Sequence, residues 1–115
     1  MTGPTFSHHS PGTVSGDGER IKGVFDIGEP YKYFTFLGQL SQPVPAFQAP
    51  HALLNYDDII KVAKAVFGSD ARVGPHDIYI PFVDNRGEIV GTVTGKLSSH
   101  VAETPVGGTV ALSLS

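Results

Sequence analysis

Glycine and proline interrupt this chain so often that a bundle of long helices is excluded. Fourteen glycines and nine prolines are spread over 115 residues, and both residue types favour turns over helix interiors. Between them lie short segments in which apolar and polar residues partly alternate, a pattern typical of β-strands. The sequence therefore predicts strands over 20–27, 31–40, 77–83, 88–97 and 109–114.

One segment in the middle of the chain has helical spacing instead. Asn55 is a suitable N-cap, Gly68 is a suitable stop, and apolar residues recur between them every three or four positions, at Ile59, Val62, Ala63 and Val66. Asp57 and Asp58 would then lie in the first turn, where the helix dipole favours carboxylates. We predict a helix over about 55–67 with one apolar face.

The segment before this helix, Ser41–His51, contains Pro43, Pro45 and Pro50. Proline lacks a backbone donor and is excluded from central strands and helix interiors. The sequence therefore predicts an extended, polyproline-like loop here.

These elements define an α+β fold as the expected class. We expect a mostly antiparallel twisted sheet, or a small sandwich or barrel, of five to six strands. The helix at about 55–67 would pack on one face of it.

The N-terminal segment differs from the rest. Residues 1–19 are rich in Gly, Ser, Thr, Pro and His and have no apolar period, so they cannot form a core of their own. The predicted organisation is an extended or flexible N-terminal arm over 1–19 and a single domain over 20–115. Such an arm becomes ordered only if something else holds it.

Charge and cysteine content narrow the classes of function. The net charge is −3, and the eight Lys and Arg residues are scattered, which disfavours nucleic-acid binding. There is no cysteine for a disulfide, a thiolate metal site or a nucleophile. No secretory signal or membrane-length apolar run is evident, so the expected location is the cytoplasm or a virion.

Motifs that would carry chemistry are incomplete. The five histidines lack the close spacing of a zinc site, so no metal site is predicted. Ser98, Ser99, His100 and Glu103 are too close along one loop to form a hydrolytic triad. The 91–96 segment resembles only part of a phosphate loop, and 84–88 only part of a calcium loop. No catalytic residue and no cofactor is predicted.

Two functions fit these observations, and the sequence favours the non-enzymatic one without deciding whether the chain is an enzyme. The first is a structural or assembly protein, for example a small virion component that decorates a capsid or associates with a tail. It would dock on protein subunits, of its own kind or of a larger assembly, through the arm and edge strands. The expected interface residues are Phe6, His8, His9, Val110, Leu112 and Leu114.

The alternative is a small-molecule-binding domain or a small enzyme with an aromatic pocket and a histidine. Its expected lining residues are Tyr33, Phe36, Tyr79, Phe82, His51 and His76.

Overall fold

The computed structural model describes residues 6–115 and, within them, all side chains except those of residues 109–111. Strands dominate, and one helix of five residues accompanies them. In chain order the elements are β1 (His8–Gly16), β2 (Arg20–Asp26), β3 (Tyr33–Leu40), β4 (Phe47–Tyr56), α1 (Ile59–Ala63), β5 (Val66–Phe67), β6 (Arg72–Val73), β7 (Asp77–Val83), β8 (Ile89–Lys96) and β9 (Thr104–Leu114).

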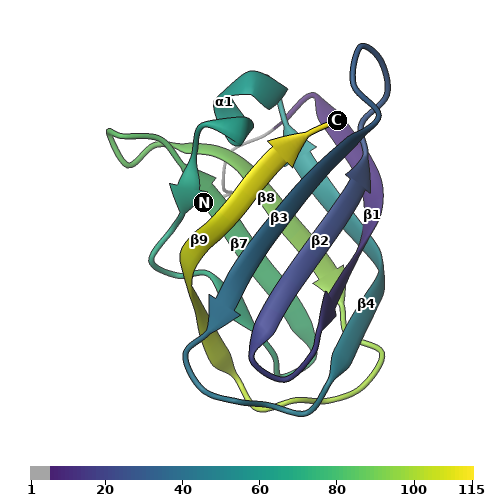
Figure 1. The fold of residues 1–115 in the computed structure, drawn as a ribbon, viewed down its shortest axis with the longest axis vertical. Helices are drawn as coiled ribbons and strands as arrows, with labels where there is room; N and C mark the ends of the chain where they lie inside the picture. The colour runs from purple at the N-terminus through teal and green to yellow at the C-terminus, as the bar shows by residue number, and fades with distance from the viewer. Residues whose placement is uncertain (1–5) are drawn as a thin grey trace.

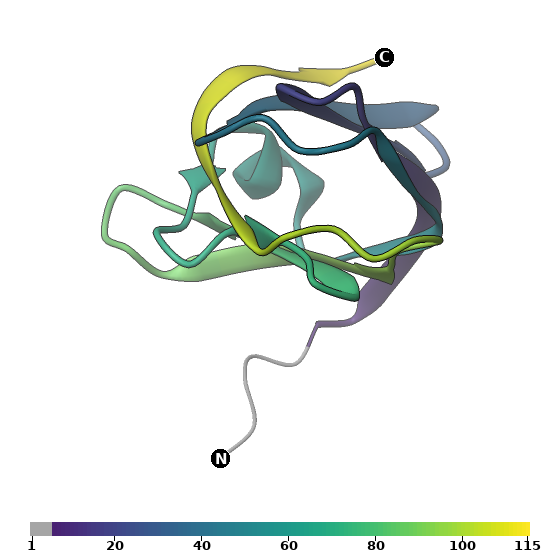
Figure 2. The same cartoon turned by 90° about the horizontal axis from the view of Figure 1, so that it is seen from below.

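Eight of these strands close into an antiparallel barrel (Figures 1 and 2). Around the ring the order is β1-β2-β3-β9-β6-β7-β8-β4, and β4 pairs with β1 to complete it. The short strand β5 lies outside this ring order and pairs with β7. The expected α+β sheet of five to six strands with a packed helix is therefore wrong, since nearly all the regular structure belongs to one closed barrel.

The predicted helix over 55–67 is the first source of this error. Asn55 is not an N-cap, because β4 continues to Tyr56 between β1 and β8. The helix begins only after Asp58, whose carboxylate accepts a hydrogen bond from Ile60 N–H at 3.0 Å. Figure 2 shows α1 within the outline of the ring, and Val62 is the buried residue of this helix.

The expected N-terminal arm is the second reason why the predicted fold is wrong. His8–Gly16 is not an appendage but strand β1, which pairs with β2 on one side and with β4 on the other. Residues 1–5 of the expected arm lie outside the described residues. The segment from His8 is ordered by its two neighbouring strands rather than by an apolar face of its own.

Phenylalanine rings lying over glycines fill the interior of the barrel. Gly12 lies opposite Phe25, Gly16 opposite Phe47 and Gly23 opposite Phe36 in the strand registers. In each pair, a Cβ added at the glycine would collide with the partner ring. An eight-stranded barrel has a lumen just wide enough for side chains, and here glycine leaves the room that the rings take.

Around these rings the core is apolar. The largest fully buried side chains are Phe25, Phe34, Phe36, Phe82, Ile21, Leu54, Ile78, Ile80, Val14, Val62, Val73 and Val93. No helix in the described part of the chain has the length and apolar character needed to cross a bilayer.

Candidate ligand-binding cleft

A β-bulge in β4 shapes the outer face of the barrel. Between the paired residues on either side, β4 has two residues, Pro50 and His51, where β1 has only Thr13. Because of the extra residue, both consecutive side chains are exposed on the outside, although the rest of β4 alternates between buried and outward positions. The predicted loop over Ser41–His51 is thus wrong from Phe47 onward, and a bulge is one of the few places where a strand accepts proline.

The bulge coincides with a break between β4 and β8. These strands pair from Tyr56 down to Leu53, which lies opposite Thr94. Beyond this pair, the next backbone hydrogen bond to β4 from this part of the chain comes from Ser98, which follows β8 and donates its N–H to the Gln48 carbonyl at 2.8 Å. The outer surface is hollowed along this break and across β7, forming a cleft of about 620 Å³. It is lined by Pro50, His51, Leu53, Arg72, Asp77, Ile78, Tyr79, Thr94, Gly95, Lys96, Leu97 and Ser98.

The strand register sets the shape of the cleft. Leu53 on β4, Thr94 on β8 and Tyr79 on β7 form one row across the outer face. Thr94 is short and lies between two larger side chains, so Leu53 and Tyr79 act as walls on either side of it. Leu53 is 41% exposed, which leaves apolar surface available to a ligand.

Charged side chains lie at one end of this row and in the next row along β7 and β8. Arg72 follows Tyr79 in the register, and its Nη1 donates to an Asp77 carboxylate oxygen at 2.9 Å and to the Gly74 carbonyl at 2.8 Å. Lys96 lies opposite Asp77 on β8. No ion pair of Lys96 is found among the described residues. The cleft therefore combines apolar walls with two cations and one carboxylate that is already paired.

Tyr79 is a neutral phenol in this setting. Burial raises its pKa above the usual value, and the nearby Asp70 carboxylate raises it further. The hydroxyl group can therefore donate or accept a hydrogen bond over the whole physiological pH range.

A second hollow of about 390 Å³ adjoins the cleft and shares Asp77, Lys96, Leu97 and Ser98 with it. The rings of His76 and His100 lie here, edge to face, with centroids 5.0 Å apart.

The described structure contains no hydrogen bond from a serine to these histidines and no cluster of metal ligands around them. Ser98 and Ser99 also line the second hollow, but no hydrogen bond joins either of them to a histidine in the described structure. Within residues 6–115, no group of three or more His, Cys, Asp or Glu side chains is placed to hold a metal ion. The polar groups of this hollow extend the cleft without forming a charge relay.

The six residues of the predicted pocket lie in four different places. Tyr79 and His51 line the cleft, and His76 lines the adjoining hollow. Phe36 and Phe82 are fully buried in the barrel core, with ring centroids 5.9 Å apart. Tyr33 lies on β3, and its side chain is 46% exposed.

Ten of the twelve lining residues are not among the expected pocket residues, and these include Leu53, Arg72, Thr94 and Lys96. The alternation of glycines with Thr92, Thr94 and Lys96 in the 88–97 segment was the available signal for an outer face on β8. Its neighbours could not be assigned without the strand order.

The N-terminal residues of the expected interface make contacts within the chain. The ring of His8 stacks on Tyr56 at a centroid distance of 5.3 Å, and His9 Nδ1 lies 2.7 Å from Asn55 Oδ1. Phe6 is half-buried.

The C-terminal residues of the expected interface lie on β9, which pairs with β3. Leu112 and Leu114 are partly buried and pack against the core. Val110 is also in β9, and its side chain lies outside the described part of the structure.

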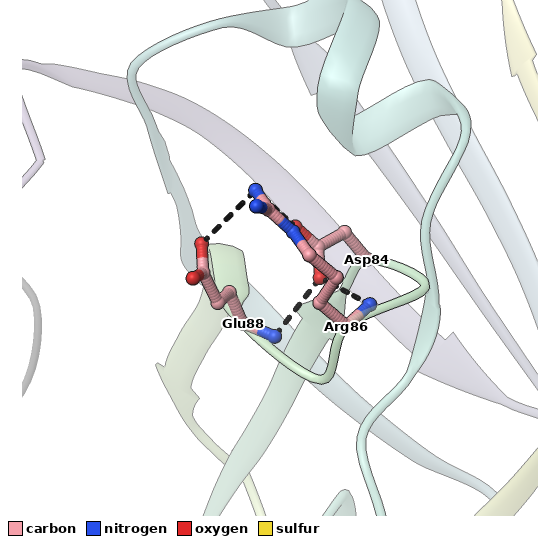
Figure 3. Close-up of polar contacts among 3 residues, drawn as sticks. All are labelled: Asp84, Arg86 and Glu88. Carbon is pink, nitrogen blue, oxygen red and sulfur yellow. Dashed lines mark hydrogen bonds and ion pairs between the residues drawn. The ribbon is translucent and has the colours of Figure 1, made fainter.

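The incomplete calcium loop is a hairpin turn between β7 and β8 (Figure 3). One Asp84 carboxylate oxygen accepts hydrogen bonds from the backbone N–H groups of Glu88 at 3.0 Å and Arg86 at 2.9 Å. These bonds, the one from Glu88 above all, lower the pKa of Asp84. The Asp84 side chain therefore serves the turn itself.

Fold and site together define an eight-stranded antiparallel barrel with a filled interior and an external cleft. No family model and no curated protein matches the sequence. The structure is similar to that of the virulence-associated protein VapD from the intracellular pathogen Rhodococcus equi, with a TM-score of 0.68. The match has 20% sequence identity and covers 96% of this chain and 100% of that one. This likeness shows the shared fold.

Proposed function

We propose that this protein is a binding module that holds a small organic ligand in the cleft over β4, β8 and β7. The observation that carries the proposal is the interruption of the β4–β8 ladder beside the Pro50–His51 bulge, which coincides with the cleft in the outer wall. The volume of about 620 Å³ is in the range of small-molecule sites, and apolar walls with few polar groups are typical of them.

The packing inside the barrel favours a ligand site in the outer cleft over one in the barrel interior. Phe25, Phe34, Phe36 and Phe82 are fully buried there. A ligand entering the interior would have to displace rings that contact one another, whereas the outer cleft needs no rearrangement of the core.

The assembly function stays a prediction, but two observations that motivated it have changed. The N-terminal segment from His8 pairs on both sides, and β9 pairs with β3. The binding function is supported by the cleft, so we prefer it to the assembly function.

The test is a fragment screen read by ¹H–¹⁵N chemical-shift mapping on the full chain. We expect fragments to shift the amides of Leu53, Thr94 and Lys96. A Thr94→Tyr variant, which fills the space between the walls, should lose these shifts. Thr35→Tyr is the matched control, since Thr35 is an outward residue on β3, far from β8 around the ring. Fragments that bind only elsewhere, or bind Thr94→Tyr as well as the wild type, would refute the proposal.

A further inference from the structure

We infer that the cleft selects a small organic anion, a carboxylate carried on a flat apolar body, with Lys96 as the residue that recognises the charge. This inference rests on the proposed binding function and adds the chemical class of the ligand. It follows from three features of the cleft, namely its walls, its charges and the length of the break in the ladder.

The walls favour a flat apolar body. Leu53 and Tyr79 lie on strands separated by β8, and their backbones are therefore about 10 Å apart, twice the usual strand spacing. With only Thr94 between them, the two side chains bound a slot that suits a ring inserted edgewise. Aromatic and aliphatic walls bury both faces of such a ring.

The charges favour an anion. The chain as a whole has a net charge of −3, yet the cleft contains the cations of Arg72 and Lys96 and the carboxylate of Asp77. Asp77 is bound to Arg72 at 2.9 Å, so its charge is largely compensated by that partner. Lys96, two residues beyond Thr94 on the same face of β8, is left to attract a ligand carboxylate.

The length of the break favours a small molecule over a peptide strand. The unpaired stretch of β4 facing β8 lies between Leu53 and Gln48 and is closed at both ends. A peptide that binds by strand addition needs an open strand edge. A compact ligand can bind in the cleft without pairing with a strand edge.

A charge series tests the inference. The probes are 2-naphthoate, 2-naphthamide and 2-naphthylmethylammonium, which share one ring system and differ in charge. Each is titrated into ¹⁵N-labelled full-length protein at low ionic strength. We expect 2-naphthoate to bind two- to fivefold more tightly than the amide, as for an exposed ion pair, and the ammonium compound to bind most weakly. The preference should shrink as salt is added.

Three variants assign the preference to one side chain. Lys96→Gln should abolish it, Lys96→Arg should keep it, and Lys22→Gln, which removes an exposed lysine on β2, should leave it unchanged. Equal affinities for the three probes, with shifts in the cleft, would overturn the inference while leaving the proposed function in place. A preference that survives Lys96→Gln would overturn the role of Lys96. If none of the probes shifts the cleft amides, the anion inference fails, and the fragment screen decides separately whether the cleft binds ligands at all.

Discussion

Gly23→Ala is the sharpest test of how the barrel interior is packed. Gly23 on β2 lies opposite Phe36 on β3, and an added Cβ would collide with the Phe36 ring. The ring has little freedom to move away, since Phe36 is fully buried. The ring centroids of Phe25, Phe67 and Phe82 lie 6.2, 5.7 and 5.9 Å from its own. The extra methyl group must therefore strain the core.

The size of the effect follows from two opposing contributions. Inserting a methyl group into a packed core costs about 1–3 kcal/mol. Replacing glycine by alanine also reduces the conformational entropy of the unfolded chain, which stabilises the folded protein by about 0.4–1 kcal/mol. We expect Gly23→Ala to lower the free energy of unfolding by about 1–2 kcal/mol, equivalent to roughly 4–8 °C in Tm for a domain of this size.

The measurement is urea unfolding at 25 °C followed by far-UV circular dichroism, with the m-value checked for constancy. Gly107→Ala is the matched control, because Gly107 is an exposed strand glycine whose added Cβ would meet nothing within 4 Å. The control should be neutral or slightly more stable than the wild type. Equal stabilities for the two variants would refute the argument that the Phe36 ring occupies the space left by Gly23.

A double variant separates this packing effect from a general loss of strand stability. Phe36→Leu removes the ring that collides with the new methyl group, so the Gly23→Ala/Phe36→Leu double variant should be less destabilised than the sum of the two single variants. We expect a coupling above about 0.5 kcal/mol, the range found for residues in contact. Additive effects would mean that the two positions do not compete for the same space.

Three further predictions concern other parts of the chain. Phe82→Ala should cost about 3–5 kcal/mol of stability as a fully buried core residue, whereas the 46%-exposed Tyr33→Ala should change stability by less than about 0.5 kcal/mol in the same urea assay. Asp84→Ala should destabilise the protein at pH 7. Because the folded pKa of Asp84 is lowered, its stabilisation is present above the unfolded pKa and lost as pH falls through the folded one, so wild type and variant should converge below about pH 4. Deletion of residues 1–16 should abolish the cooperative thermal transition, since it removes a strand with two neighbours; a truncated chain that still melts cooperatively would contradict the closed ring.

The strands that were predictable from the sequence carry their own apolar pattern. The strand expected over 77–83 is confirmed as β7, and those expected over 20–27 and 31–40 correspond to β2 and β3 within two residues at each end. In each, buried side chains recur at every second position. Strand β1 was missed because its inward positions include Ser10, Gly12 and Gly16, which give no hydrophobic signal. The apolar groups that fill the space inside Gly12 and Gly16 belong to neighbouring strands.

Strand β4 was missed for a different reason. Pro50 argues against a central strand only while the ladder is regular, and here it lies at a bulge where pairing with β8 has also stopped. The helical spacing after Asn55 was real but local, since it holds for the five residues of α1 and ends before β5. Sequence periodicity could not show that Asn55 is paired with residues of two neighbouring strands, β1 and β8.

Two of the six pocket residues expected from the sequence lie in the candidate cleft. Tyr79 and His51 were expected to line a pocket, and both line the cleft. Leu53 and Lys96 could not be predicted, because their place in one cleft depends on which strands are neighbours and where their ladder stops. A pocket made by a register defect leaves no contiguous motif in the sequence.

The two irregularities that conceal the fold from sequence analysis also determine where a ligand can bind. Glycines inside the strands let phenylalanine rings fill the lumen, as at Gly23 and Phe36, so that the interior is occupied by the protein itself. Binding must then use the outer wall, where the cleft lies along the interrupted β4–β8 ladder. The bulge at Pro50 and His51 provides that interruption, turns both side chains outward, and places them beside the slot between Leu53 and Tyr79. Removing the bulge would thus restore a regular wall and, with it, eliminate the cleft while leaving the core intact.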